Sequence, residues 1–263
     1  MPPTDSPVEH LPRSLGFSLR TLSLTILVLC ILLVVLKLFS DAVVNARRAS
    51  IKSDAQSPLN QLALALQNYH DHWGEFPPAY LADADGTPMH SWRVLVLPYV
   101  EQGSLYEQYD FDEAWNGPKN SRLADKMPRV FHSHSEPEST EFTNIVVIVG
   151  PGTAFPGSRT TKFEEFTDGR ENTILLTEIT DSKINWLEPR DLNVETMSFS
   201  LNDVRQPSIS SVYWRQPYVV FADSIKAYAV SGDMSPEALR GLTTIAGNES
   251  VTRTELEAHG FLK

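Results

Sequence analysis

The feature that most constrains this chain is an apolar run near its N-terminus. Residues 21–39 read TLSLTILVLCILLVVLKLF, and Lys37 carries the only charge among them. A helix of this length spans about 28 Å, which is close to the hydrocarbon thickness of a bilayer, roughly 30 Å. Lys37 lies near the end of the run, so its ammonium group can reach the lipid–water interface. We therefore predict a single transmembrane anchor over residues 16–40, with residues 21–39 in contact with the lipid bilayer.

Two other interpretations of the run are open at this point. A buried core helix would need apolar partners on all sides, and no other segment of the sequence is apolar enough to supply them. A cleaved signal peptide has a shorter apolar core, followed by a cleavage site between small residues. Alanine-containing triplets do follow the run, in SDAVVNARRASIKSDA. The length of the run nevertheless favours a retained anchor.

Positive charges flank the run unevenly. The flanking residues are Arg13 and Arg20 before it, and Lys37, Arg47, Arg48 and Lys52 at its end and after it. Because loops rich in lysine and arginine stay on the cytoplasmic side, this count places the C-terminal part of the chain inside the cell.

Charge and cysteine content exclude several classes of function. The net charge is −11, with 22 Lys and Arg against 33 Asp and Glu, and no basic stripe is present. This balance argues against a nucleic-acid partner, because neutralising phosphates requires clustered cations. The only cysteine, Cys30, lies inside the apolar run. The rest of the chain therefore has no disulfide, no cysteine-based zinc site and no cysteine nucleophile.

The pattern before and after the run divides the chain into four parts. Residues 1–15 are polar and rich in proline, which predicts a disordered tail. After the anchor, residues 41–72 form a predicted helical stem, in which Leu59, Leu62, Leu66 and Tyr69 share one face. Ser57 and Pro58 resemble a helix cap followed by a first-turn proline, so the helix either restarts or kinks there. Residues 73–263 form the predicted globular domain.

Turn residues and apolar periodicity predict short elements in this domain. They are a helical stretch over residues 91–109 that Pro98 and Gly103 bend or divide, strands at 145–149 and 173–179, a hairpin of 218–222 and 225–230, a helix starting at Ser235 and Pro236, and a last helix near 252–259. Helices first and strands later indicate an α+β fold, in which the long N-terminal helix packs on an antiparallel sheet.

Several segments in order resemble the large bacterial family of pilin-like proteins that carry the domain of unknown function 1559. These are LNQLALALQNYHDHWGEFPPAY at 59–80, ADADGTPMHSWRVLVLPYVEQGSLYEQYDFDEAWNGPKN at 82–120, TDGRENTILLTEITDSKINWLEPRDL at 167–192, and the later FADSIKAYAV and SPEALRGLTTIAGNE. Together they cover nearly the whole chain after residue 40.

The resemblance implies a protein similar to type IV pilins or secretion pseudopilins. Such a protein has a helix that is half in the membrane and a globular domain that is exported to the periplasm or cell surface. Other pilin-like or envelope proteins would be its partners. This orientation is opposite to the one that the Lys and Arg count gives, and we follow the resemblance.

The chain departs from the family pattern at both ends. Gly16 and Phe17 resemble a prepilin-type cleavage site, but Thr21 stands where the family has a glutamate that supports fibre assembly. The family tail has a histidine, nine residues and then Asp-Gly, whereas this chain has Tyr213 and Asp223-Ser224. The resemblance thus implies a relative that keeps the anchor and the fold without that histidine and glycine.

Histidine and aspartate pairs are the candidates for metal binding. His70 and His72 stand at a helix end, where residues two apart point in different directions, and His132 and His134 lie in a polar stretch. The segment from Asp83 to Gly86 starts like a calcium loop but lacks the required glutamate, so we predict a tight turn with Gly86 at positive φ. Calcium-binding pseudopilins use C-terminal carboxylates, and the resemblance makes Asp168, Glu178 and Asp223 a second calcium candidate.

Catalysis has little support in the sequence. Asp168, Glu178 and Glu188 could serve as paired carboxylates of a glycoside hydrolase, although turns and a strand explain them equally. No Gly-x-Ser-x-Gly, P-loop or dinucleotide fingerprint is present. We therefore expect no catalytic residues, no cofactor and no enzymatic activity.

Two hypotheses of function follow. The first is a membrane-anchored structural or interaction protein that acts through surface contacts. The alternative is an extracytoplasmic module that binds a small ligand or a glycan. Five tryptophans could stack on such a ligand: Trp73, Trp92, Trp115, Trp186 and Trp214.

Overall fold

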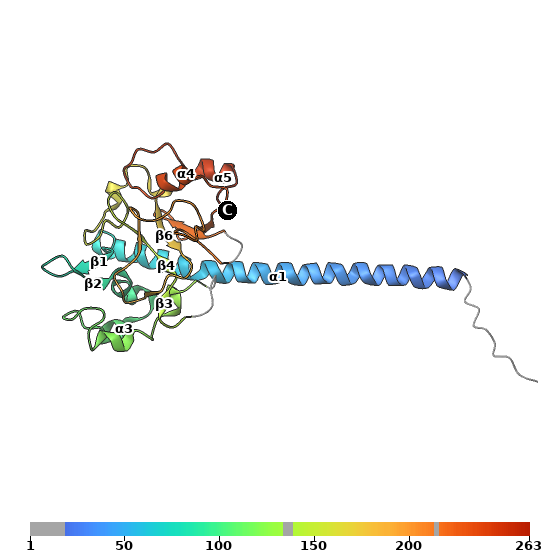
Figure 1. Cartoon of the computed structure of the whole chain (residues 1–263), viewed down its shortest axis with the longest axis horizontal. Coiled ribbons are helices and arrows are strands. Elements are labelled where there is room, and N and C mark those ends of the chain that lie inside the picture. The colour runs from blue at the N-terminus through green and yellow to red at the C-terminus, as the bar shows by residue number, and fades with distance from the viewer. Residues whose placement is uncertain (1–18, 134–138, 213–215) are drawn as a thin grey trace, which may run out of the picture. The chain divides into compact units, whose positions relative to one another are not determined.

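The computed structural model describes residues 19–133, 139–212 and 216–263 (Figure 1). The chain forms two compact units, Met1–Ser50 and Ile51–Lys263. The predictions made for residues 1–15, for the bond between Gly16 and Phe17, and for His134, Tyr213 and Trp214 concern residues outside the described part, as does the side chain of Thr21.

The described part of the first unit is the beginning of helix α1, Leu19–Trp73. Its segment Leu22–Arg47 is long and apolar enough to cross a membrane, and none of it is buried. Leu29 and Leu33, for example, are each more than half exposed. The predicted apolar helix is therefore confirmed as a candidate membrane anchor or signal segment. The core-helix interpretation is not supported, because the apolar side chains have no protein packed around them.

The end of α1 belongs to the second unit and carries its apolar stripe. Leu59, Leu62 and Leu66 are fully buried in the core, and Tyr69 packs against the same core. These positions recur every three or four residues, so they lie on one face of the helix. The helix runs through Pro58 without a restart. The second unit begins at Ile51, so the last turns of α1 belong to it.

The centre of the second unit is a four-stranded antiparallel sheet. Its strands are β4 (Ile145–Val146), β6 (Ile174–Glu178), β9 (Tyr218–Phe221) and β10 (Ala227–Ala229), in the order β10-β9-β6-β4. Successive strand residues point to opposite faces and form two core clusters. Val220 packs in the cluster that contains the buried stripe of α1. Val219 packs in the cluster that contains side chains of α4 (Pro236–Gly241) and α5 (Arg253–Ala258). The sheet thus lies between the two helical layers, and the predicted hairpin is confirmed.

Three two-stranded sheets surround this centre. They are β1 (Tyr80–Ala82) with β2 (Pro88–Ser91), β3 (Phe142–Thr143) with β7 (Ile184–Asn185), both antiparallel, and β5 (Ile148–Val149) with β8 (Leu192–Asn193), which is parallel. The strand predicted over residues 145–149 is divided into β4 and β5. At the division, the Val147 N–H donates to the Asp191 carboxylate instead of to a neighbouring strand.

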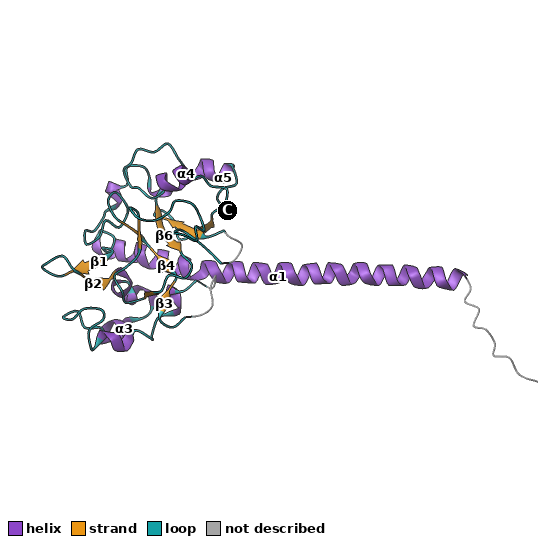
Figure 2. Cartoon of the chain, in the orientation of Figure 1, coloured by secondary structure: helices purple, strands orange, loops and turns teal. Residues whose placement is uncertain are grey.

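Short helices complete the domain (Figure 2). They are α2 (Trp92–Leu95), α3 (Gly103–Gln108), α4 (Pro236–Gly241) and α5 (Arg253–Ala258), with 3-10 turns at Leu97–Val100, Asn120–Leu123, Arg129–Phe131, Phe163–Glu165 and Arg170–Asn172. The predicted helical stretch is divided near Pro98 and Gly103, as expected. Side chains of Ser235 and Thr252 cap α4 and α5 by accepting backbone N–H bonds, so both predicted helices are confirmed.

The outer edge of the sheet, strand β10, is covered by two separate parts of the chain. The Ala227 N–H donates to the Asn60 side chain (2.8 Å), and the Gln56 amide donates to the Ala227 carbonyl (3.1 Å). Further along the strand, Ala229 and Lys263 exchange two backbone hydrogen bonds. Helix side chains and the C-terminal residues therefore satisfy an edge that would otherwise be open to pairing with another strand.

Candidate functional site

A buried ion pair fixes one end of the candidate site. Arg93 lies in the first turn of α2, and Asp191 immediately precedes β8. The Arg93 Nη2 is 2.6 Å from Asp191 Oδ1 and its Nη1 is 3.3 Å from Oδ2. Both side chains are essentially unexposed, at 0% and 1%. The two parallel contacts make this a bidentate, charge-assisted interaction.

Further donors and acceptors surround both charges. Asp191 Oδ1 also accepts from the Val147 N–H (3.1 Å) and from the Trp92 indole N–H (3.3 Å). The guanidinium donates to the Ser91 hydroxyl and to the Ile145 carbonyl, each at 3.1 Å. Burial raises the pKa of Asp191, while Arg93 and the N–H donors act in the opposite direction. Because arginine does not lose its proton, a protonated Asp191 would leave a buried cation unpaired, so we infer an ionised pair at neutral pH.

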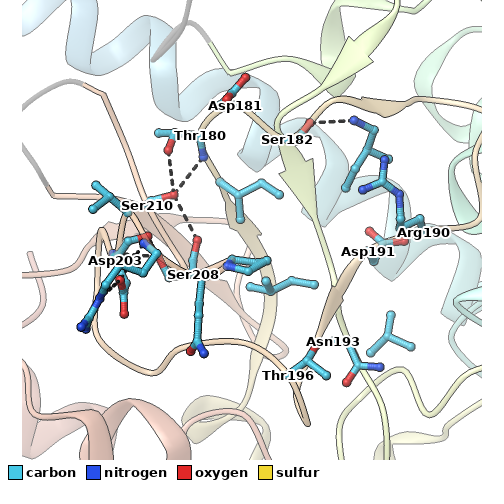
Figure 3. A pocket seen from close by; sticks show the side chains of 18 of the residues that line it. Thr180, Asp181, Ser182, Arg190, Asp191, Asn193, Thr196, Asp203, Ser208 and Ser210 are labelled. Atoms are coloured by element: carbon cyan, nitrogen blue, oxygen red, sulfur yellow. Dashed lines mark hydrogen bonds and ion pairs between the residues drawn. The ribbon is translucent and has the colours of Figure 1, made fainter.

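A groove of about 830 Å³ lies beside this pair. Its lining includes the buried apolar side chains of Ile179, Ile184 and Leu192. Figure 3 shows the polar side chains on two sides of this space, with Thr180, Asp203, Ser208 and Ser210 facing Asp191, Asn193 and Thr196. The groove therefore combines an apolar lining with hydroxyl, amide and carboxylate groups at its borders.

Hydrogen bonds between the loops hold one border in place. The Thr180 N–H donates to the Ser210 Oγ (2.9 Å), and the Ser210 hydroxyl donates to the Ser208 carbonyl (3.0 Å). The Asp203 carboxylate accepts from the Ser198 hydroxyl (2.9 Å). The Arg205 backbone N–H, together with Ser198 and the Arg205 side chain, holds the pKa of Asp203 below its usual value. This border is thus built before any ligand arrives.

Glu178 is fully buried at the end of β6, but it does not line the groove. Its Oε2 accepts from the Ser133 hydroxyl (2.9 Å), and its Oε1 accepts from the Tyr218 backbone N–H (3.0 Å). Burial, and secondarily the charge of Glu178, raise the pKa of Tyr218 to about 12. Glu178 therefore links β6 to β9 and to the segment before β3.

The three carboxylates of the calcium hypothesis lie in three different settings. Asp168 accepts from the backbone N–H groups of Gly247 and Asn248, at 2.5 and 3.0 Å. Asp223 forms a bidentate pair with Arg253, at 2.6 and 2.8 Å. Within the described residues, no three His, Cys, Asp or Glu side chains are arranged to hold a metal ion. Asp168, Glu178 and Asp223 are therefore not brought together.

The hydrolase hypothesis used Asp168, Glu178 and Glu188. Glu188 forms a bidentate pair with the neighbouring Arg190, at 2.6 and 3.1 Å. None of the three carboxylates is among the described residues that line the groove. Each one serves a separate local contact.

The histidine pairs are also separated by their packing. The His70 ring packs on Phe76 and Phe163, with centroids 5.0 and 3.8 Å away, whereas His72 packs beside Trp73 at 5.0 Å. The His70 Nε2 is buried and has no hydrogen-bond partner among the described atoms. His132 is buried next to the fully buried Ser133. The segment at Asp83 is a turn, as predicted: its carboxylate accepts two backbone N–H bonds, and Gly86 has φ +85°.

The four tryptophans that the structure describes do not form the predicted stacking face. Trp92 and Trp186 are completely buried, and Trp115 is partly buried against the core. Trp73 is 62% exposed, and its indole N–H donates to the Tyr99 hydroxyl (3.1 Å). Large aromatic side chains contribute most by filling the core, which explains why Trp92 and Trp186 lie there.

The sequence interpretation missed the residues that matter most in this region. It assigned no role to Arg93 or Asp191, although an arginine next to tryptophan in SWR and an aspartate after proline and arginine in EPRD lie in the segments that carry the family resemblance. Charged residues are rarely fully buried unless they are paired. The position of Arg93 inside an otherwise apolar run, in SWRVLVL, is the one signal that could have indicated its burial.

An α+β domain with small antiparallel sheets, carrying an N-terminal helix that is a candidate membrane anchor, defines the class of this protein. Residues 45–157 match the family described as a protein of unknown function (DUF1559). This match confirms the resemblance to the family with the domain of unknown function 1559. No curated protein and no solved structure matches the chain.

Proposed function

We propose that this chain is a membrane-anchored, pilin-like structural or interaction protein of the cell envelope. In this proposal its domain is exported and acts through surface contacts rather than by catalysis. The observation that carries the proposal is the difference in burial between two segments of α1. The segment Leu22–Arg47 is apolar and unburied, whereas Leu59, Leu62 and Leu66 of the same helix are core residues of the domain.

The energetics of lipid insertion support the anchor. Leucine, isoleucine, valine and phenylalanine near the centre of a membrane helix each favour insertion by about 0.3–0.6 kcal/mol. Residues 26–36 consist of these apolar types and Cys30. Ser23 and Thr25 lie nearer the start, where their hydroxyls donate to backbone carbonyls of Leu19 and Leu22. Such local bonds reduce the cost of placing hydroxyls in an apolar environment.

The settings of the carboxylates support a role without catalysis. Asp168 organises a turn, Glu178 joins two strands and Glu188 pairs with Arg190. A glycosidase needs two carboxylates facing one substrate, with one of them free to give up and take back a proton. The contacts of these three side chains are instead those of residues that stabilise a fold.

Cysteine labelling tests the proposed orientation. Cys30 is the only cysteine, so Cys30→Ser combined with Val204→Cys creates one reporter at a side chain that is 97% exposed. We expect a membrane-impermeant maleimide to label it in spheroplasts whose cytoplasmic membrane is intact. Labelling only after the membrane is permeabilised would place the domain in the cytoplasm, as the Lys and Arg count suggests, and would contradict the proposal. The Cys30→Ser protein is the unlabelled control.

Mass spectrometry of the mature N-terminus tests the pilin-like part of the proposal separately. A prepilin-type protein would begin at Phe17 after cleavage behind Gly16. A chain that keeps Met1 would still be anchored but would not be processed like a pilin. A chain that begins within residues 41–55 would instead indicate a cleaved signal peptide, and the anchor would then be absent from the mature protein.

A binding module remains the second candidate function because of one observation, the groove beside the Arg93–Asp191 pair. Sites for small molecules are concave and mostly preformed, with apolar walls and a few placed polar groups. The groove meets this description with its apolar lining and its hydrogen-bonded border.

A further inference from the structure

We propose that the groove binds a neutral, hydroxyl-rich ligand, such as a short segment of an oligosaccharide. It is bounded by residues 179–184, 189–196 and 203–210, with Tyr80 and Val149 completing its lining. This inference goes beyond the proposed envelope function, and it does not depend on the orientation of the domain in the membrane.

The charges at the groove already have partners, which argues against an ionic ligand. Arg190 is held by Glu188 through two contacts, at 2.6 and 3.1 Å. Asp191 is neutralised by Arg93, and Arg205 lies 3.3 Å from Asp203. The remaining charged residue of the lining, Asp181, lies 3.6 Å from the Lys183 ammonium group. A phosphate or carboxylate ligand needs cations that are available to it, and a cationic ligand needs available carboxylates. Displacing the buried Arg93–Asp191 pair would leave uncompensated buried charges, a cost that a neutral ligand does not incur.

Uncharged polar groups at the groove have hydrogen-bonding capacity left. Among the described residues, no hydrogen bond engages the Asn193 amide nitrogen, the Thr196 hydroxyl or the Gln206 side-chain amide, although the Asn193 Oδ1 accepts from the Glu195 N–H (2.8 Å). All three side chains are exposed. Together these hydroxyl and amide groups supply both hydrogen-bond donors and acceptors. A ligand rich in hydroxyl groups also has both, so the two sets can pair.

The apolar part of the lining fits the same class of ligand. Ile179, Ile184 and Leu192 are buried against the core and border the groove. A sugar ring presents C–H groups on its faces and hydroxyls around its edge, so it can contact apolar side chains and polar borders at once. The volume of about 830 Å³ lies within the range of small-ligand sites, roughly 300–1,000 Å³.

The groove is also organised in advance, which lowers the cost of binding. The loop at Ser208 and Ser210 is tied to Thr180, and the Ser198 N–H donates to the Pro207 carbonyl (2.9 Å). On the other border, the β5–β8 pairing fixes Asn193 opposite Val149. A ligand that enters pays little to order these segments, because their backbones are already hydrogen-bonded.

Calorimetry on the full chain in lipid nanodiscs tests the proposal. Nanodiscs avoid glycoside detergents, whose sugar headgroups would compete for the groove. The probes are the neutral tetrasaccharides cellotetraose, chitotetraose, maltotetraose and mannotetraose, compared with an acidic tetragalacturonate and a tetraglycine peptide. We expect saturable binding of at least one neutral tetrasaccharide. The triple variant Asn193→Ala, Thr196→Val, Gln206→Ala should bind it about tenfold or more weakly, since several hydrogen bonds are lost.

A matched control separates the groove from the rest of the surface. Thr254→Val changes an exposed threonine on α5, outside the groove, and should leave the affinity unchanged. Circular dichroism of the triple variant checks that it folds as the parent does. The proposal is overturned if no neutral tetrasaccharide saturates the protein, if the acidic or peptide probe binds more tightly, or if the triple variant binds as the parent does.

Discussion

The guanidinium of Arg93 and the carboxylate of Asp191 form a buried bidentate pair across 98 positions of sequence. The pair also binds the Trp92 indole, the Ser91 hydroxyl and the N–H of Val147, the residue between β4 and β5. It therefore joins the segment around α2 to the segment before β8. Both segments belong to the blocks that carry the family resemblance, which explains how blocks far apart in the sequence meet in one structure.

Removing the carboxylate should destabilise the domain strongly. In Asp191→Ala the Arg93 cation stays buried without a counter-charge, and the Val147 and Trp92 donors lose their acceptor. Breaking a buried pair from one side costs about 3–5 kcal/mol. We expect a loss of this size in the free energy of unfolding, measured by denaturant titration with tryptophan fluorescence.

The planar geometry of the Arg93 guanidinium should matter for stability as well as its charge. Arg93→Lys keeps the positive charge but cannot reproduce the two parallel contacts to Asp191 or the bonds to Ser91 and Ile145. We expect it to be destabilised nearly as much as Asp191→Ala. The exposed pair of Arg205 and Asp203 gives the control, because Arg205→Lys at a solvated side chain should change the stability by less than about 0.5 kcal/mol. Equal effects at the two arginines would contradict the assigned role of Arg93.

Asn60 should contribute to stability by covering the edge of β10. In Asn60→Ala the Ala227 N–H loses its acceptor in a partly buried position, which costs about 1–3 kcal/mol. The matched control is Asn68→Ala, an exposed asparagine of the same helix, in which the gain in helix propensity is the same. The difference between the two variants in denaturant titrations isolates the edge contact. No difference would show that water replaces Asn60 at the strand.

The burial of two histidines should make the stability of the domain fall in mild acid. Desolvation lowers the pKa of His90 below its ordinary value, and its Nδ1 lies 2.9 Å from the Tyr109 hydroxyl. The unfolded chain then binds more protons than the folded chain as the pH falls through about 6.5, so stability present above this pH is lost below it. His70, whose pKa burial also lowers, acts in the same direction.

Denaturant titrations between pH 7.5 and about 5.5 check this dependence. The free energy of unfolding should be nearly constant at the upper end and should fall toward the lower end. His90→Gln removes one titrating group and should make the fall shallower, although its stability at pH 7.5 is lower. A parent protein that gains stability on acidification would reverse the sign and refute the argument.

Local patterns predicted much of the fold. The spacing of Leu59, Leu62 and Leu66 gave the buried face of α1, and Ser235 followed by Pro236 gave the start of α4, because these signals act over a few residues. The strand over residues 145–149 was predicted whole, and it is divided because Val147 turns to Asp191. No local pattern contains a partner that lies 44 positions away.

The candidate site was beyond what local patterns can give. Its groove is assembled from loops around residues 180, 191 and 205, whose side chains are ordinary for polar turns. The sequence offered the tryptophans as candidate stacking residues for a ligand, yet Trp92 and Trp186 are core residues. Composition and spacing identify aromatic residues without indicating whether they face the core or the solvent, and only the tertiary structure decides between the two.

Charges at the centre of the apolar segment should abolish membrane integration. Leu29 and Leu33 lie one turn apart in Leu22–Arg47, and both are exposed. Each arginine near the centre of a span costs about 2.5–3.5 kcal/mol and removes a favourable leucine, so Leu29→Arg with Leu33→Arg should cost roughly 6–8 kcal/mol. We expect the double variant to leave the membrane fraction in alkaline carbonate, while the control Leu29→Ile with Leu33→Ile stays there. A parent protein that carbonate extracts, with its N-terminus trimmed, would show that the segment is a signal and not an anchor.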